Sequence, residues 1–182
     1  MRGSVYSPPP AYEPAFWSIA CADPKYTARI GKTAAAGTNT AWVANLAVYV
    51  PFALASYTTI YEWFWVNGTL TTAHNIDFGI YRQDFTKIQS LGSTVGATTA
   101  SVLLNTSTWT DLVLAPGNYY MAFADDSTRN LSTSADASGL YQAQGCMEQT
   151  ASSFPLPSPA VPIAYTRAFL PLFGFNMRTV AL

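Results

Sequence analysis

The chain has 182 residues, enough for one domain with a sizeable core and too few for two large ones. Its formal net charge is −1 at pH 7, so it lacks the basic surface that nucleic-acid-binding proteins use, and we expect no DNA or RNA partner. It also has no run of about 20 apolar residues, the length that a membrane-spanning helix requires, and we expect no membrane partner.

Charged residues make up only 10 % of the chain, against about 25 % in an average soluble protein, while aromatic residues make up 14 %. A free monomer normally covers itself with charged side chains, which keep it soluble. We therefore expect other chains, including further copies of this one in a homo-oligomer, to cover much of the surface.

Residues 1–40 are predicted to form an extended, proline-rich N-terminal arm. Prolines at positions 8, 9, 10, 14 and 24 favour extended backbone and prevent a continuous helix. Because disordered linkers rarely contain many aromatic residues, we expect the rings of the arm to dock on its own domain or on a neighbour. The predicted interface residues of the arm are Tyr6, Tyr12, Phe16, Trp17 and Tyr26. The first residues lack the apolar core of a secretory signal, and we expect no export by that route.

Residues 41–182 are predicted to form one β-sandwich domain. Its clearest element is a hairpin at Asn75–Leu91, in which Ile76, Phe78 and Ile80 recur at the period of two that is typical of a half-buried strand. A polar turn and a second alternating run complete the hairpin.

Other strands are predicted on both sides of this hairpin, at Ala41–Val50, Thr58–Val66, Trp109–Leu114, Asn118–Asp125 and Ala168–Phe175. Pro51 is expected to end the first of them, because proline cannot donate to a strand ladder. Residues 126–145 are predicted to form a long polar loop, and no stretch shows helical periodicity. The total of roughly seven or eight strands predicts an all-β, antiparallel, jelly-roll-like sandwich.

Catalytic chemistry finds little support in the sequence, and we expect no enzyme. His74 is the single histidine, so a Ser/His/Asp or Cys/His arrangement could form only around it. A solvated or hydrogen-bonded histidine at a strand end is the favoured interpretation. The carboxylates considered for an acid pair are Glu62, Asp77, Asp84, Asp125 and Asp126. Four of them lie near turns, where aspartate caps local backbone; Glu62 shares a face with core residues and is expected to pair with Arg82 or another arginine.

No metal or cofactor is expected. Asp125, Asp126 and Asn130 could supply oxygen ligands to calcium, but their spacing matches no known loop signature, so a polar loop without metal is favoured. Cys21 and Cys146 could pair; two unpaired thiols are the favoured alternative.

Tyr61, Trp63 and Trp65 lie two residues apart and are predicted to share one face of a strand. Rings at this spacing could form a platform on which sugar rings stack. The alternative is an assembly interface covered by the arm or by a neighbouring subunit, since exposed apolar patches are rare on soluble proteins. The low surface charge favours the covered interface.

Three segments carry a resemblance to a known group of proteins: LAVYV, DFGIYRQDFTKIQSLGS and LVLAPGNYYMAFADDS. Their order is similar to that in β-sandwich modules of tailed-bacteriophage virion proteins, in which a G-I-Y hairpin and an L-x-P-G-x-Y-Y strand recur. The resemblance implies a non-enzymatic structural protein located in a phage virion, with other virion proteins as partners. A capsid decoration or cement protein is the first expectation. A tail, collar or fibre component, or a carbohydrate-binding module that recognises a host-surface glycan, is the alternative.

Overall fold

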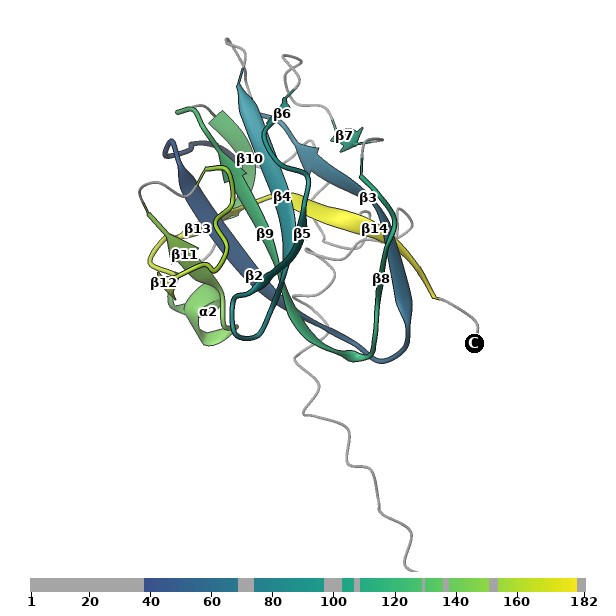
Figure 1. Cartoon of the computed structure of the whole chain (residues 1–182). Coiled ribbons are helices and arrows are strands. Elements are labelled where there is room, and N and C mark those ends of the chain that lie inside the picture. The colour runs from purple at the N-terminus through teal and green to yellow at the C-terminus, as the bar shows by residue number, and fades with distance from the viewer. Residues whose placement is uncertain are drawn as a thin grey trace, which may run out of the picture.

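A computed structural model describes residues 38–68, 74–96, 103–106, 109–128, 130–135, 138–150 and 154–179. Within these residues the protein is an all-β sandwich of antiparallel sheets with one short helix, α2 (Ser138–Ala143) (Figure 1). The fold class predicted from the sequence is therefore confirmed. Nearly all of the predicted arm, including its five interface aromatics, lies outside the described residues.

The larger sheet has seven strands, in the order β12-β11-β2-β9-β4-β5, with β6 also paired to β4. Its strands are β2 (Leu46–Leu54), β4 (Asn75–Arg82), β5 (Lys87–Ser90), β6 (Thr94–Val95), β9 (Gly117–Asp125), β11 (Met147–Gln149) and β12 (Ile163–Ala164). The predicted hairpin is confirmed as β4 and β5, which pair antiparallel. The centre of the sheet is β9, which pairs along its length with β2 on one side and β4 on the other.

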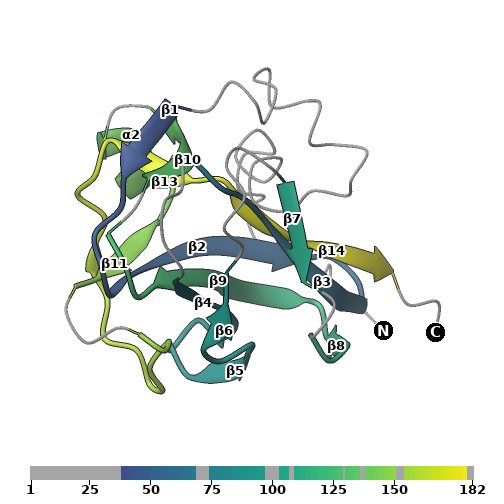
Figure 2. The same cartoon turned by 90° about the horizontal axis from the view of Figure 1, so that it is seen from above.

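The second sheet has four strands and packs across the first. It consists of β3 (Thr58–Val66), β7 (Leu103–Thr106), β8 (Leu112–Leu114) and β14 (Phe173–Thr179). A three-stranded sheet of β1 (Thr38–Ala41), β10 (Asn130–Ala135) and β13 (Phe169–Pro171) lies at one side of the sandwich (Figure 2). Successive long strands β2, β3 and β4 alternate between the two main sheets, as in jelly-roll sandwiches.

Aromatic rings fill the main core between the two sheets. Trp63 of β3 stacks on Phe78 of β4 with ring centroids 5.0 Å apart and planes 14° apart. Phe175 of β14 and Phe123 of β9 complete the packing from opposite sheets, each at most 1 % exposed. The inward residues of β4 are the alternating set that the sequence predicts.

A second apolar cluster lies on the opposite face of the large sheet, beneath the segment Phe154–Pro162, here called the strap. Ala122 and Ala124 are fully buried there, and their small side chains allow the strap to lie close to the sheet. Leu156 of the strap packs into this cluster. The layer over these alanines is therefore a segment of the same chain.

Three details differ from the predictions. Strand β2 runs through Pro51 to Leu54. Proline has no N–H to donate, but β11 pairs only with residues 47–49, so among the described residues no strand on that side of Pro51 needs a donor. The predicted loop at 126–145 contains β10 and α2. Finally, the described residues contain fourteen strands where seven or eight were expected, because eight of the fourteen have four residues or fewer and leave little periodicity in the sequence.

Candidate functional site

The predicted aromatic platform on β3 is not a surface in this structure. Trp63 is 0 % exposed and Trp65 is 5 % exposed, and both rings belong to the main core. Tyr61 is half-buried. A sugar-stacking platform or a subunit interface needs accessible rings, so the interpretation of the two tryptophans as a glycan platform or an interface is corrected: they are core residues.

A β-bulge separates Tyr61 from the two tryptophans, with which the period-two pattern had grouped it. Asn176 of β14 lies opposite Glu62, whereas the next residue, Met177, lies opposite Ile60, so Tyr61 is the extra residue. The bulge shifts the phase of the strand, and Ile60 joins the tryptophans in the core. Glu62 accepts a hydrogen bond of 2.6 Å from the side chain of Asn176; among the residues that the structure describes, no ion pair joins it to Arg82.

Asp125 caps local backbone as expected, whereas Asp126 bonds a strand that is distant in sequence. Asp125 accepts hydrogen bonds from the backbone N–H and the hydroxyl of Ser127, at 2.9 and 3.0 Å. Asp126 accepts from the backbone N–H of Asn75 at 2.9 Å and from its side-chain amide at 2.6 Å. Among the residues that the structure describes, no three His, Cys, Asp or Glu side chains are grouped as a metal site would need.

Asp77 is the most unusual of the acids, because it is fully buried between the large sheet and the strap. Its carboxylate accepts the backbone N–H of Gly92 at 2.8 Å and that of Leu156 at 2.9 Å. Burial raises the pKa of Asp77 to about 6, while the two N–H donors and the nearby Lys87 act in the opposite direction. Both oxygens are engaged by backbone, so the arrangement suits a structural acid that fastens the strap.

The remaining catalytic candidates are also buried. His74 is 4 % exposed and packs directly against Gly96, where a Cβ atom would lie 1.8 Å from Nε2 of the imidazole. Cys146 is a free thiol at 1 % exposure, and burial raises its pKa to about 12, which disfavours the nucleophilic thiolate. Cys21 lies outside the described residues.

One buried acid is not among the carboxylates predicted from the sequence. Glu148 of β11 is 2 % exposed and accepts a hydrogen bond of 2.8 Å from the hydroxyl of Thr166. It also forms an ion pair of 3.2 Å with Arg167. Its partners lie in the segment that follows β12, so Glu148 anchors that segment to the sheet. Nothing in the local sequence distinguishes it from an exposed strand glutamate.

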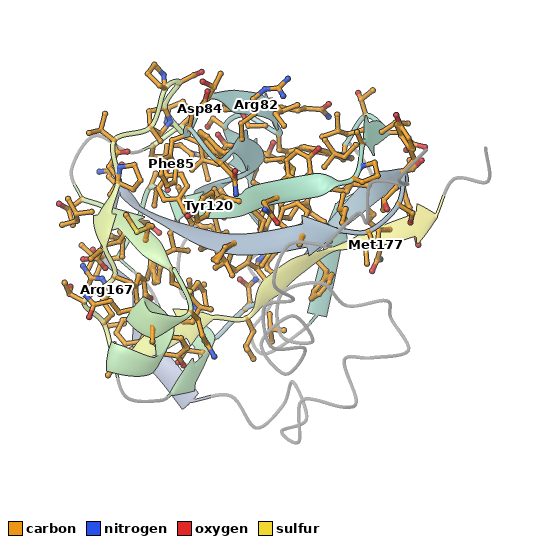
Figure 3. All side chains as sticks on the ribbon, turned by 90° about the horizontal axis from the view of Figure 1, so that it is seen from below. Arg82, Asp84, Phe85, Tyr120, Arg167 and Met177 are labelled. Carbon is orange, nitrogen blue, oxygen red and sulfur yellow. The ribbon has the colours of Figure 1, made fainter. Side chains whose placement is uncertain are left out.

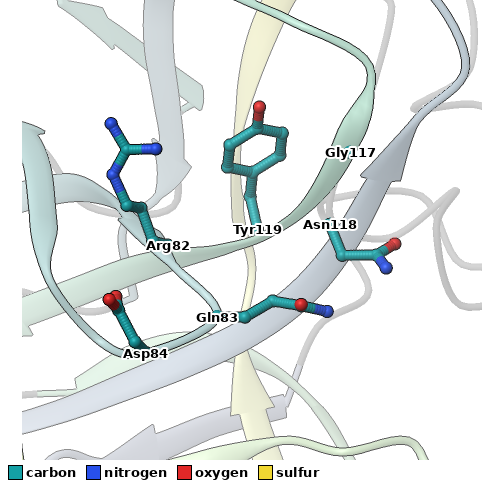
Figure 4. Close-up of a pocket in the computed structure, with 6 residues that line it drawn as sticks. All are labelled: Arg82, Gln83, Asp84, Gly117, Asn118 and Tyr119. Atoms are coloured by element: carbon teal, nitrogen blue, oxygen red, sulfur yellow. The ribbon is translucent and has the colours of Figure 1, made fainter.

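An open pocket of about 320 Å³ lies at one end of the large sheet. It is formed where the turn of the β4–β5 hairpin meets the start of β9, and its lining residues are Arg82, Gln83, Asp84, Gly117, Asn118 and Tyr119 (Figure 4). No local pattern groups these residues, because they come from two segments more than thirty positions apart. The pairing of β4 with β9 brings them together.

Comparison with known proteins supplies no relative for this geometry: no family model, curated protein or solved structure matches the chain. In the described part of the chain, no helix has the length and apolar character needed to cross a membrane.

Proposed function

We propose that this protein is a non-enzymatic structural subunit of a tailed-phage virion, with capsid decoration or cementing as its first role. A tail, collar or fibre position is the alternative. The single observation behind this proposal is the composition: 10 % charged residues leave the fold too few charges to cover itself as a free monomer normally does.

The two sequence motifs that carry the resemblance lie on paired strands, and this supports the proposal. The G-I-Y motif lies on β4 and the L-x-P-G-x-Y-Y motif leads into β9, and these two strands are neighbours. Tyr81 of the first motif lies directly opposite Tyr120 of the second. The two motifs are therefore neighbours at the centre of the large sheet.

The edge of the large sheet at β12 supports a role in an assembly. Val161 is 75 % exposed and Ile163 is 55 % exposed, and residues 161–164 contain no charge. Soluble monomers usually protect a sheet edge with charged side chains, especially lysine. Pro162 limits strand pairing at its own position, so we assign this edge to side-chain contact with a neighbouring subunit.

Particle fractionation tests the proposed function. Virions from the source culture are separated on a density gradient, and the amount of this chain in each fraction is measured by quantitative mass spectrometry. The proposal expects co-sedimentation with the particles at a fixed ratio to the major capsid or tail protein. A chain that stays at the top of the gradient, or whose ratio varies from one preparation to the next, contradicts it.

A further inference from the structure

We propose that the pocket at the tip of the β4–β5 hairpin is a binding site for a neutral saccharide. This inference goes beyond the proposed structural role and does not depend on it. It also differs from the glycan platform predicted on β3, because its residues belong to the large sheet and its hairpin turn, whereas β3 belongs to the second sheet.

The position of one aromatic ring begins the argument. Tyr119 of β9 lies directly opposite Arg82 on one neighbouring strand and Phe52 on the other, so the three side chains form a row on the same face of the sheet. Phe52 belongs to the main core, and the ring of Tyr119 packs against it at a centroid distance of 5.6 Å. The hydroxyl of Tyr119 donates to the carbonyl of Ala115 at 2.9 Å. These contacts hold the ring as a fixed wall of the pocket.

The turn that forms the other wall is also held in place. Phe85, in the left-handed region with φ of 61°, turns its ring to the opposite face of the sheet, where it stacks on Tyr120 at 4.6 Å (Figure 3). Within the turn, the backbone N–H of Thr86 donates to the carboxylate of Asp84 at 2.9 Å. The backbone N–H of Arg82 donates to the carbonyl of Thr86, and the carbonyl of Arg82 accepts from the N–H of Phe85, both at 3.0 Å. A site whose walls are fixed before binding loses less entropy when the ligand arrives.

The polar groups of the pocket fit a ligand rich in hydroxyl groups. Arg82 offers several N–H donors, Asp84 offers acceptors, and the amides of Gln83 and Asn118 offer both. The side chains of Arg82, Gln83 and Asp84 are exposed to solvent, so a ligand can reach them. A sugar hydroxyl both donates and accepts, and the C–H face of a pyranose packs against an aromatic ring such as that of Tyr119.

Charge and size narrow the ligand class further. One arginine and one aspartate line the pocket, so their formal charges of +1 and −1 cancel, which favours a neutral ligand over a phosphate or a carboxylate. The pKa of Asp84 is lowered, mainly by its hydrogen bonds with Thr86, so the acceptor stays ionised at neutral pH. A volume of about 320 Å³ is at the small end of ligand sites and suits one or two sugar units.

The experiment uses the full chain and a defined panel of probes: the methyl glycosides of glucose, galactose, mannose and N-acetylglucosamine, and an array of neutral oligosaccharides. Saturation-transfer NMR detects weak binding, and titration gives the affinity. We expect binding of at least one probe with Kd on the order of 1 mM, because the pocket is open and small.

Two substitutions locate the site. Arg82→Ala and Gln83→Ala each remove an exposed donor and are expected to weaken binding by about tenfold and about threefold. Gln142→Ala, on the exposed surface of α2, is the matched control and leaves the affinity unchanged. Thermal unfolding of each variant verifies that the fold persists. Absence of binding by the wild type across the panel and array overturns the proposal, as does binding that Arg82→Ala and Gln83→Ala leave intact.

Discussion

Asp77 joins three parts of the chain that are distant in sequence. Its carboxylate accepts the N–H of Gly92, after the β4–β5 hairpin, and the N–H of Leu156 in the strap. Two neighbours reinforce the strap beside it: Lys87 donates to the carbonyl of Leu156 at 2.7 Å, and Tyr81 donates to that of Pro157 at 2.6 Å. Side-chain hydrogen bonds, with the buried carboxylate at their centre, thus hold the strap to the sheet.

Removing this carboxylate should destabilise the fold. Asp77→Ala leaves two backbone N–H groups without an acceptor, and we expect the free energy of unfolding to fall by about 2 to 4 kcal/mol. Chemical denaturation measures the change. Asp84→Ala is the control, since Asp84 and its partner Thr86 are both exposed to water, and it should cost much less than Asp77→Ala. Equal costs for the two variants would show that burial of Asp77 is unimportant.

The raised pKa of Asp77 predicts a pH dependence with a definite sign. The unfolded carboxyl ionises near 3.8 and the folded one near 6, so between these values the folded state binds more protons. The stability contributed by protonated Asp77 is therefore full below about pH 4 and is lost as pH rises to about 6. Relative to Asp77→Asn, the wild type should lose about 3 kcal/mol of unfolding free energy over this window. A difference that stays flat, or that grows with pH, would contradict the assignment.

At the scale of elements, β3 and the strap are the two segments whose roles the sequence left most open. Strand β3 has apolar residues on both faces, and only the bulge at Tyr61 determines that Ile60, Trp63 and Trp65 all face inward. A bulge depends on the partner strand β14, so it cannot be inferred from β3 alone.

Trp63 should therefore behave as a core residue. Trp63→Ala removes the ring that stacks on Phe78, and we expect a loss of about 3 to 5 kcal/mol in unfolding free energy, measured by urea denaturation. Tyr57→Ala provides the comparison, because Tyr57 is 40 % exposed and its truncation should cost less than about 1 kcal/mol. A Trp63→Ala protein as stable as the wild type would contradict the assignment of Trp63 to the core.

The contact between the strap and β4 is testable by a double-mutant cycle. A Cβ at Gly79 would lie 3.0 Å from Cδ1 of Leu156 and 3.2 Å from the carbonyl oxygen of Gln89. Gly79→Ala should cost about 1 to 3 kcal/mol in the wild type and less in a Leu156→Ala background, where the first neighbour has been removed. Thermal or chemical unfolding of the four proteins gives the coupling. Identical costs in both backgrounds would place the strap away from Gly79.

The sequence identifies the hairpin, β9 and the sandwich class because alternation at period two persists over eight or nine residues. It does not identify β10, α2 or the short strands β6, β11 and β12, whose six residues or fewer contain too little pattern. The candidate pocket was equally hidden. Arg82 and Tyr119 are adjacent only because β4 pairs with β9, and no local signal predicts which distant strands will pair.

At the scale of the whole molecule, the position of β1 refines the boundary of the folded domain. The sequence divides the chain at residue 40, but Thr38–Ala41 form β1 and pair with β10. The hydroxyl of Thr40 lies 2.8 Å from that of Thr133, within this pair. A truncation designed to remove only the predicted arm should therefore end at residue 37.

Removing residues 1–37 should leave a domain that unfolds cooperatively, with a Tm within about 4 °C of the full chain, and that no longer joins particles. Circular dichroism measures the first property and gradient co-sedimentation the second. Removing residues 1–41 is the comparison, since β10 then loses its pairing with β1 and keeps only β13, and the Tm should fall further. We predict that the arm binds the particle; a protein shortened by residues 1–37 that still joins particles would contradict this.

The pairing of β3 with β14 also has a consequence during synthesis. Trp65 lies opposite Phe173, so β3 leaves the ribosome long before its neighbour exists. During that interval a strand with two tryptophans presents an open edge, which is the kind of surface that promotes aggregation. Non-local pairings also slow folding, typically to milliseconds or seconds. Recombinant yield should therefore depend more on chaperone supply and growth temperature than on the stability of the finished sandwich.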